Sequence, residues 1–368
     1  MKILHIITGM TYGGAQKFLI SLSQEHIRSK AEVAVIGLYP GPLGQSLNDY
    51  GITYFEYNFK RKIDPRILFE IMRVIRQWSP DVVHTHLGTA DFYGRIAAKL
   101  SKVKRVVSTI HNEEDWKSKA IYRHLDNFSL LFADYIVACS KSVYESLNTQ
   151  SESNNKIKLI ENGVDTSIEV RKSREDIYRE INITTDSRLI VCIGRLEEQK
   201  NHQLLLKAIS ILKRPELKVC FIGAGSREVF LKELEIQLGI SDNIIWIPQT
   251  SDPYSYISAS DIMVLPSLWE GLPIVLLESM SLEKLIIASD IESHRHVINS
   301  GRNGFLFRSG DADDLARCIK AALDIDKNLL KDIEVSANQT VKSRYDIKEA
   351  ARKYMEVYTN GKLSSAEC

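Results

Sequence analysis

Short apolar runs alternate with amphipathic stretches along most of the chain. Amphipathic stretches such as 15–26 and 65–78 carry apolar residues at helical spacing. Continuous apolar strands between helices are typical of a parallel sheet covered on both faces. The pattern therefore predicts an α/β protein. In the first half, the expected strands lie at residues 3–7, 33–38, 82–86, 106–110, 135–138 and 157–160.

A polar interval divides this pattern into two halves. It follows the turn pair Asn162-Gly163 and runs over residues 165–187. Two sets of strands and helices joined by such a linker predict two doubly wound, Rossmann-like domains, 1–168 and 169–345. Ligands bind beyond the carboxyl ends of such strands, so we expect the domains to face each other across a ligand-binding cleft. The strands of the second half are expected at 189–193, 219–222, 244–247, 262–265 and 285–288, and a last helix, 346–362, is expected to pack back on the first domain.

Composition is that of an ordinary globular protein, with 368 residues, 44% hydrophobic and 26% charged. The formal net charge of +1 argues against a nucleic-acid partner. Residues 1–130 nevertheless hold 18 Lys and Arg against 12 Asp and Glu, a balance of +6, and the remainder holds 30 against 35, a balance of −5. The first domain is therefore the basic one.

Much of that positive charge is clustered. Lys60, Arg61, Lys62 and Arg66 follow one another closely, beside the aromatic Phe59. Such a cluster can rest on anionic lipid headgroups, or it can be a solvated face. The sequence leaves both interpretations open.

Five cysteines form no C-x-x-C pair, which is typical of small core residues in a reducing compartment. A strand expected from residue 3 leaves no room for a signal peptide, and no apolar run is long enough to span a bilayer. These features predict a cytoplasmic protein, with attachment to the inner face of the membrane as an open possibility.

The most informative stretch reads E-G-L-P-I-V-L-L-E, from Glu270 to Glu278. Gly271 allows a turn where backbone approaches a ligand, and Pro273 is well placed as the first residue of a helix. A helix N-terminus suits a diphosphate, and carboxylates beside it accept hydrogen bonds from hydroxyls. A nucleotide sugar carries both kinds of group. An ordinary turn and helix with a solvated Glu is the alternative.

Further candidates follow other predicted strands. Arg195 and Lys200 stand around a helix start, where two cations suit a diphosphate. Gly223 and Gly225 end the next strand but lack the third glycine of a dinucleotide fingerprint. The loop with Gly13 and Gly14 has Ala15 where a P-loop needs Lys, so it presents at most backbone amides to a phosphate.

Three histidines fall near strand ends in the first domain. His84 and His86 share one face of a strand, and His111 ends the next strand, followed by Asn112. No H-E-x-x-H or D-x-D pattern supplies a further metal ligand, so core or cleft-lining histidines are the preferred interpretation over a metal site. His111 lies where a substrate-contacting imidazole is expected.

Taken in order, these pieces resemble the GT-B glycosyltransferases, and within them the retaining family 4. The resemblance covers nearly the whole chain. Each motif is weak alone, and their combination is specific. The motifs are the Gly13-Gly14-Ala15 loop, D-V-V-H-T-H at 81–86, S-T-I-H-N at 108–112, E-N-G-V-D at 161–165, G-R-L-x-x-x-K at 194–200 and E-x7-E at 270–278.

The resemblance implies a residue-level assignment on the donor side. Arg195 and Lys200 would hold the donor diphosphate, Glu278 the ribose hydroxyls, and Glu270 the hydroxyls of the transferred sugar. The backbone of Gly271, Leu272 and Pro273 would meet sugar and phosphate, with Gly223 and Gly225 also on the donor side.

The same resemblance implies roles in the first domain. His111 would contact the donor sugar near the reaction centre, and the Gly13-Gly14 loop would close over the diphosphate. His86 and Asn112 would lie on the acceptor side. The family's reaction retains anomeric configuration and needs no metal or other cofactor.

The expected function is therefore transfer of a hexosyl or N-acetylhexosaminyl group from a UDP- or GDP-linked sugar. The acceptor would be a glycan or a polyprenyl-diphosphate-linked sugar in bacterial surface polysaccharide assembly (O-antigen, capsule or exopolysaccharide). The alternatives are a nucleotide-sugar 2-epimerase and a non-catalytic nucleotide-sugar binding protein. One departure from the family is the loop at 291–298, where Glu292 is misplaced and His296 stands near the usual Glu position.

Overall fold

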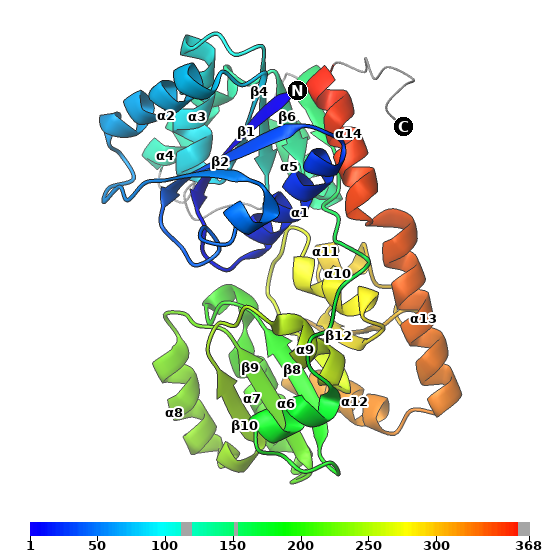
Figure 1. Cartoon of the computed structure of the whole chain (residues 1–368). Coiled ribbons are helices and arrows are strands. Elements are labelled where there is room, and N and C mark those ends of the chain that lie inside the picture. Colours follow the sequence, from blue (N-terminus) through cyan, green and yellow to red (C-terminus); the bar gives the residue numbers. More distant parts are fainter. Residues whose placement is uncertain (112–119, 151–153, 360–368) are drawn as a thin grey trace. The chain divides into compact units, whose positions relative to one another are not determined.

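The computed structural model describes residues 1–111, 120–150 and 154–359. The chain forms two compact units. Unit 1 comprises Met1–Gly163 and Ile347–Cys368, and unit 2 comprises Val164–Asp346. Each unit is built on one parallel sheet flanked by helices (Figure 1). The predicted α/β class with two Rossmann-like domains is confirmed.

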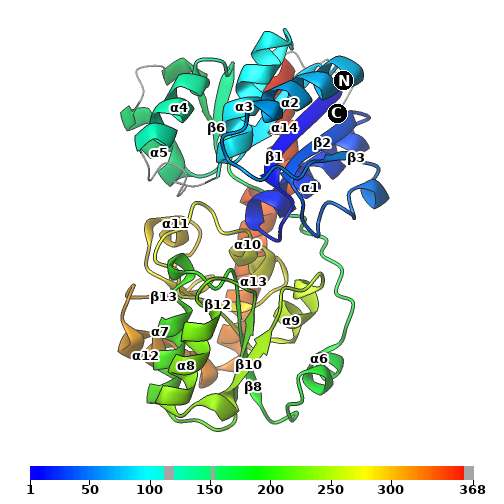
Figure 2. The same ribbon diagram turned by 90° about the vertical axis from the view of Figure 1, so that its left-hand side faces the viewer.

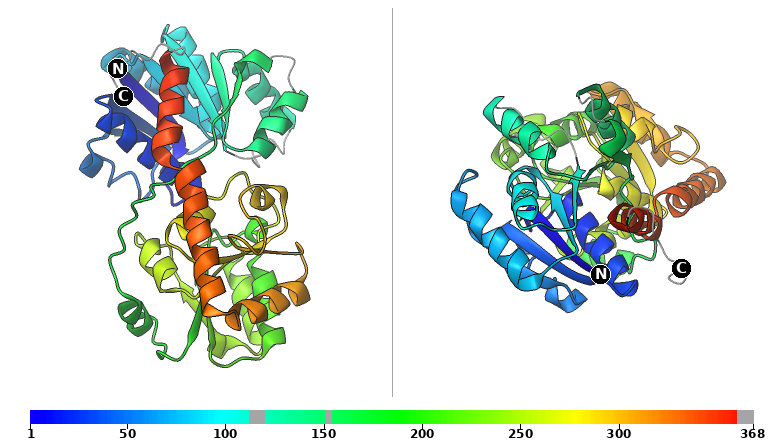
Figure 3. Two further views of the ribbon diagram at one scale, coloured as in Figure 1. Left: turned by 90° about the vertical axis from the view of Figure 1, so that its right-hand side faces the viewer. Right: turned by 90° about the horizontal axis from the view of Figure 1, so that it is seen from above.

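Unit 1 contains a seven-stranded sheet in the order β3-β2-β1-β4-β5-β6-β7. Helices α2, α3 and α4 lie together on one face, and α1 packs against the terminal helix α14 on the other (Figures 1 and 3). The elements are β1 (Lys2–Gly9), α1 (Gly14–Arg28), β2 (Glu32–Tyr39), η1 (Asn48–Tyr50), β3 (Thr53–Glu56), α2 (Pro65–Trp78), β4 (Val82–His86), α3 (Gly88–Leu100), β5 (Arg105–Ile110), α4 (Ala120–Leu130), β6 (Tyr135–Ala138), α5 (Lys141–Gln150), η3 (Asn154–Lys156), β7 (Ile157–Leu159) and α14 (Ile347–Thr359).

Unit 2 contains a six-stranded sheet in the order β10-β9-β8-β11-β12-β13. Helices α7, α8 and α12 cover one face, and α9, α10 and α13 cover the other (Figure 2). The elements are α6 (Arg174–Glu180), β8 (Arg188–Ile193), η4 (Glu198–Lys200), α7 (His202–Leu212), β9 (Leu217–Ile222), α8 (Glu228–Leu238), η5 (Ser241–Asn243), β10 (Ile244–Ile247), α9 (Pro253–Ala259), β11 (Ile262–Leu265), α10 (Ile274–Ser281), β12 (Leu285–Ser289), α11 (Glu292–Arg295), β13 (Phe305–Phe307), α12 (Ala312–Leu323) and α13 (Lys327–Arg344).

The central strands are buried on both faces, and most of them have the continuous apolar sequence that such burial favours. All residues of β11 and β12 are buried, and so are all residues of β4, including its two histidines. A parallel sheet covered by helices leaves such strands no solvated side. The two strands absent from the sequence prediction, β3 and β13, are both edge strands.

A buried arginine ties the helical layer of unit 1 to the sheet. Arg95 of α3 is wholly buried and donates hydrogen bonds to Asp126 (2.6 Å) and Ser129 (2.9 Å) of α4. It also donates to Ser108 of β5 at 2.9 Å. A buried guanidinium is tolerated only with such partners. The network therefore fixes how α3 and α4 lie on the strands that carry the histidines. Among the described helices, none is long and apolar enough to cross a bilayer.

Candidate active site

The sheet of unit 2 has a topological switch point between β8 and β11. The chain runs outward from β8 through β9 to β10, and then returns to place β11 on the other side of β8. Loops after two such strands diverge and leave a crevice at their carboxyl ends, where ligands bind in open α/β sheets. Arg195 and Lys200 follow β8, and Glu270 follows β11. The two motifs singled out in the sequence therefore meet at this crevice.

The loop after β8 presents two cations differently. Arg195 is exposed, and its Nη2 donates to Gln199 Oε1 at 3.3 Å. Lys200 ends a short 3₁₀ turn, and its side chain is only 18% exposed. A Cβ at Gly194 would lie 3.2 Å from Cδ of Lys200, so the lysine stem runs close over the glycine. Arg195 is thus the more accessible of the two charges.

Lys200 and Glu270 form an ion pair that links the two loops. The Lys200 ammonium contacts Glu270 Oε1, and the Glu270 side chain is 8% exposed. The same carboxylate accepts from Ser267 Oγ at 2.8 Å and from Gln199 Nε2 at 3.4 Å. A carboxylate so deeply buried requires such hydrogen-bond and charge partners, because burying it without them is costly. The pair therefore holds both side chains at the crevice in defined positions.

Helix α10 begins at Ile274, one residue later than the sequence prediction. Pro273 is the residue before the helix, with φ −73° and ψ 113°, rather than its first residue. Gly271 and Leu272 are buried beside it. Glu278 lies one turn into α10, is 3% exposed, and accepts a hydrogen bond from Tyr254 Oη at 2.8 Å. Its burial excludes the interpretation of a solvated surface Glu.

Gly223 and Gly225 have a packing reason that the sequence did not reveal. A Cβ at Gly223 would lie 2.0 Å from the carbonyl oxygen of Gly194, and the residue has φ +153°. A Cβ at Gly225 would lie 2.4 Å from the Leu196 carbonyl oxygen. Only glycine permits the loop after β9 to pack so closely on the loop after β8. These glycines shape the Arg195 loop, and their contact with a donor stays a prediction.

Several side chains of this constellation were missed. Ser267 and Gln199 hold Glu270, and Tyr254 of α9 holds Glu278. His294 is fully buried, and burial lowers its pKa while the nearby Glu270 charge acts to raise it. Gln199 lay inside a quoted motif, but Tyr254 comes from a different element and carries no local signal.

Unit 1 has its own switch point, between β1 and β4. The Gly13-Gly14 loop follows β1, and α1 starts at Gly14 without a side-chain cap on its first amides. Gln16 Nε2 donates to the Gly9 carbonyl at 2.8 Å, which closes the loop on itself. After β4, Leu87 adopts φ +70°, a strained conformation for a residue with a side chain. Such strain is typical of functional loops.

His86 and His111 are brought together in unit 1. His86 is fully buried and its Nδ1 lies 3.1 Å from His111 Nε2. Burial lowers the pKa of His111 to about 4 and that of His86 well below its ordinary value. Both rings are therefore neutral near pH 7. His86 is 0% exposed, so it does not itself face solvent, and its Nδ1 contacts His111. Asn112 lies outside the described residues.

A metal site formed by histidines of unit 1 was the alternative interpretation, and it has a geometric basis that the sequence did not show. Ligand nitrogens of His5, His84 and His86 lie within 4.8 Å of one another. Both nitrogens of His84 already have partners, Tyr358 Oη and Thr109 Oγ1, each at 2.7 Å. The nitrogens of His86 are bonded to neighbouring imidazoles. A metal would have to displace these bonds, so a hydrogen-bonded cluster fits the geometry better.

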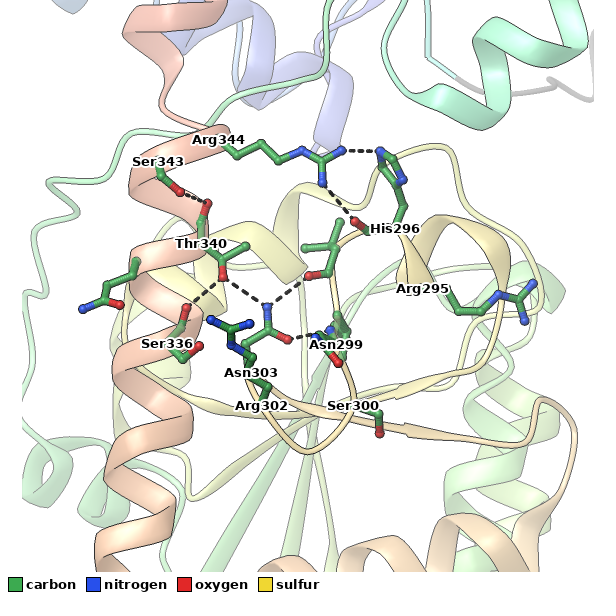
Figure 4. Close-up of a pocket in the computed structure, with 13 residues that line it drawn as sticks. Arg295, His296, Asn299, Ser300, Arg302, Asn303, Ser336, Thr340, Ser343 and Arg344 are labelled. Carbon is green, nitrogen blue, oxygen red and sulfur yellow. Dashed lines mark hydrogen bonds between the residues drawn. The ribbon is translucent and has the colours of Figure 1, made fainter.

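A separate pocket of about 760 Å³ opens between the loop after β12 and helix α13 (Figure 4). Asn303 fixes its floor by donating to the Val297 carbonyl and to Thr340 Oγ1, each at 3.1 Å. Arg344 of α13 donates to the His296 carbonyl at 3.2 Å and to the His296 ring. His296, which stands near the position of the family's usual Glu, thus lies in the pocket wall, where Arg344 holds it.

Comparison with protein families identifies the chain. The family model for glycosyl transferases group 1 matches residues 173–360, and the model for Glycosyltransferase Family 4 matches residues 12–168. The chain therefore belongs to the glycosyl transferases group 1 family. The match contains every donor-side candidate of unit 2.

Curated relatives are similar over most of their length. The chain is 25% identical to the UDP-Gal:alpha-D-GlcNAc-diphosphoundecaprenol alpha-1,3-galactosyltransferase of Escherichia coli, covering 88% of each protein. It is 27% identical to the GalNAc-alpha-(1->4)-GalNAc-alpha-(1->3)-diNAcBac-PP-undecaprenol alpha-1,4-N-acetyl-D-galactosaminyltransferase of Campylobacter jejuni, covering 93% of this chain and 94% of that protein.

Solved structures share the fold over almost the whole chain. HepE from Anabaena in complex with UDP-glucose superimposes with a TM-score of 0.86 at 19% identity, covering 98% of this chain and 100% of that one. A glycosyltransferase from Rickettsia africae gives a TM-score of 0.81 at 22% identity, covering 98% and 99%. The two parallel-sheet units are therefore those of GT-B glycosyltransferases.

Proposed function

We propose that the protein is a retaining glycosyltransferase that moves a sugar from a UDP- or GDP-linked donor to a glycan or polyprenyl-diphosphate-linked acceptor, in the assembly of a bacterial surface polysaccharide. One observation carries the donor side of the proposal. The switch point of unit 2 joins an exposed Arg195, a Lys200–Glu270 pair and a buried Glu278 at the start of α10. Cations, carboxylates and a helix N-terminus match the diphosphate and hydroxyls of a nucleotide sugar.

The roles on the donor side follow from this chemistry. Arg195 and Lys200 neutralise the diphosphate as it leaves with the bonding electrons. Glu278 accepts hydrogen bonds from the ribose hydroxyls, and Glu270 from hydroxyls of the transferred sugar. The backbone at Gly271, Leu272 and Pro273 donates to phosphate and sugar oxygens, and the loop at Gly223 and Gly225 supports the donor.

In unit 1, the Gly13-Gly14 loop offers backbone amides to the diphosphate, and His111 contacts the donor sugar. Asn112, and His86 by way of His111, belong to the acceptor side. The acceptor hydroxyl attacks on the face that the diphosphate leaves, and a leaving phosphate oxygen takes its proton. No protein nucleophile is required, and the anomeric configuration is retained.

The names of relatives support the acceptor class. The proteins from Escherichia coli and Campylobacter jejuni act on sugars linked to undecaprenol through a diphosphate. A relative at 24% identity from Staphylococcus aureus is named a capsular polysaccharide biosynthesis glycosyltransferase. We infer a donor and acceptor of these general kinds for this chain.

A thermal-shift panel of nucleotides and nucleotide sugars tests the donor class. A ligand of the folded state stabilises the protein by about 2.7 kcal/mol at one hundred times its Kd. UDP or GDP and their sugars are expected to raise the unfolding temperature, with ADP and CMP as matched controls. No shift with any uridine or guanosine diphosphate would remove the proposed donor.

Sugar transfer is expected to continue in EDTA, because Arg195 and Lys200 supply the positive charge that a metal would otherwise bring to the leaving group. Initial rates are compared in EDTA and in added Mg²⁺ or Mn²⁺. Complete loss in EDTA, reversed by either ion, would contradict this assignment.

We also propose that the α2 face of unit 1 rests on an anionic membrane surface. Phe59 does not provide the exposed aromatic expected there, because it is half-buried and stacks on Tyr57 with a centroid distance of 5.4 Å. The exposed apolar side chains in this stretch are instead Phe69 of α2, which is 68% exposed, and Ile63, which is 50% exposed. Lys60, Arg61, Lys62, Arg66, Arg73 and Arg76 are exposed in the same stretch of the chain, where Arg66 pairs with Asp64 and Arg73 pairs with Glu70.

Sedimentation with liposomes tests this surface. Each basic residue near anionic lipid contributes about 1 kcal/mol, so binding is expected to fall with rising salt. Changing Lys60, Arg61 and Lys62 to Ser is expected to release the protein. A triple Ser variant at Lys207, Lys232 and Lys320, exposed lysines of unit 2, removes the same charge and should bind as the wild type does. Equal binding by both variants would make the α2 face a solvated one.

A further inference from the structure

Three buried imidazoles of unit 1 form an unbroken hydrogen-bonded row. His5 Nδ1 lies 3.1 Å from His86 Nε2, and His86 Nδ1 lies 3.1 Å from His111 Nε2. His5 and His86 are fully buried, and His111 is 9% exposed. The outer nitrogens, His5 Nε2 and His111 Nδ1, are buried without a hydrogen-bond partner among residues 1–111, 120–150 and 154–359. The row runs from the core to the carboxyl end of β5.

Burial keeps the three rings neutral. Desolvation lowers the pKa of His111 to about 4, and it is the main cause that lowers those of His5 and His86 well below the ordinary value. A neutral imidazole carries one N–H and one bare nitrogen. Three rings therefore supply one N–H for each of the two bonds and one surplus N–H, which lies at an end of the row.

Only two proton arrangements satisfy both bonds, because His86 has a single N–H. If His86 donates from Nδ1 to His111, then His5 donates to His86 and the surplus N–H is on His111 Nδ1. If His86 donates from Nε2 to His5, then His111 donates to His86 and the surplus N–H is on His5 Nε2. The tautomers of His5 and His111 are thus coupled through His86.

The surroundings of the two ends decide between these arrangements. Both outer nitrogens are buried without a hydrogen-bond partner among the described residues, and buried orphan N–H groups are rare, so the surplus N–H requires a partner from a ligand. His5 is 0% exposed in the core of unit 1, which leaves no access for a ligand, whereas His111 is 9% exposed. A surplus N–H on His111 Nδ1 lies at the end of a strand, where ligands of such sheets bind. The first arrangement, with a bare Nε2 on His5, is favoured.

We infer that His5 and His86 are positioning residues that fix His111 as the Nδ1–H tautomer, so that His111 donates a hydrogen bond to a hydroxyl oxygen of the transferred sugar. The inference rests on the proposed function for its ligand. It makes His111 a hydrogen-bond donor and not a base, because its Nε2 lone pair accepts from His86. The orientation of a catalytic histidine by a bond to its second nitrogen is a known device.

Nitrogen-15 NMR of the histidine rings in the protein without substrate tests the tautomer directly. At neutral pH, His111 is expected to show a protonated Nδ1 and a bare Nε2. In His86→Leu these signals are expected to move toward a mixture of tautomers. His84→Leu is the matched control, since it removes an equally buried imidazole of β4 that lies outside the row.

Steady-state kinetics supply a second readout. In His86→Leu we expect kcat to fall about tenfold or more, as for other residues that orient a functional histidine. The KM for the nucleotide sugar should change little, because the proposed diphosphate and ribose contacts of unit 2, and the backbone amides of the Gly13-Gly14 loop, are not altered by the substitution. If His86→Leu does not fold, His5→Asn is measured in its place. A side-chain amide can either donate a hydrogen bond to His86 or accept one from it, so in this variant residue 5 no longer sets the direction of the hydrogen bonds along the row.

A His111 protonated at Nε2 in the wild type would overturn the inference, and so would signals that are identical in His86→Leu and wild type. If His86→Leu and His84→Leu lose kcat equally, both losses reflect lower stability alone. That result would contradict the positioning role of His86. Failure of the wild type to transfer any sugar would defeat the proposed function but leave the NMR result to decide the tautomer.

Discussion

Lys200→Ala is expected both to destabilise unit 2 and to weaken donor binding. The substitution leaves Glu270, at 8% exposure, without its cation. Breaking such a pair by removing one partner costs about 3 kcal/mol, near the lower end for buried pairs because Lys200 itself is 18% exposed. Loss of a charge-assisted contact to the diphosphate adds about 1–3 kcal/mol to the free energy of donor binding.

A double variant separates the two effects. Lys200→Ala combined with Glu270→Gln removes the uncompensated charge, so most of the lost unfolding free energy is expected to return, while donor affinity stays low. Urea unfolding and calorimetric titration with the nucleotide diphosphate measure the two quantities. Lys232→Ala is the control, because Lys232 forms an exposed pair with Glu228 within α8, and its loss leaves no buried charge. Donor affinity restored by the double variant would show that Lys200 serves the fold alone.

The free energy of unfolding is expected to fall steeply between pH 6.5 and pH 4. Burial lowers the pKa of His26 and His111 to about 4 and that of His202 to about 3, whereas the unfolded chain titrates near 6.5. The unfolded state therefore binds more protons in this window, and the stability present above pH 6.5 is lost as the pH falls. Each of these histidines lowers the free energy of unfolding by about 2 kcal/mol at pH 5. This is a large share of the free energy of unfolding of a typical protein, which is about 5–15 kcal/mol.

One variant isolates a single contribution to this loss. His202 of α7 is 2% exposed, and neither ring nitrogen has a hydrogen-bond partner in the described part of the chain. His202→Leu thus removes a titrating group without removing such a bond. Its unfolding free energy should depend less on pH than that of the wild type, by about 2 kcal/mol between pH 7.5 and pH 5. A pH-independent stability in the wild type would show that the buried histidines hydrate and protonate freely.

The fold was predictable because its central strands are continuous apolar runs, which only a covered parallel sheet accommodates. The edge strands β3 and β13 were missed for the opposite reason. Thr53–Glu56 mixes polar and aromatic residues, and Phe305–Phe307 is apolar but only three residues long, so neither forms an apolar run of the usual strand length. Pro273 was placed one position too far into α10, an error within the usual uncertainty of helix ends.

The candidate site was predictable where a motif lies within one loop, and not where it depends on contacts between loops. Glu270 and Glu278 were found from their spacing, but the pairing of Glu270 with Lys200 joins residues seventy positions apart. Tyr254, which holds Glu278, comes from a helix without any motif. The histidine row combines residues of β1 and β4 with the residue that follows β5, so only the sheet order reveals it.

Release of a nucleotide diphosphate from a UDP- or GDP-sugar, measured with and without a polyprenyl-diphosphate-linked acceptor, tests the central claim most directly. We expect rapid release only with acceptor present, and a product in which the sugar keeps the anomeric configuration of the donor. A nucleotide-sugar 2-epimerase would convert the donor without any acceptor, and a binding protein would leave it unchanged. Either result, or a product of inverted configuration, would contradict the account.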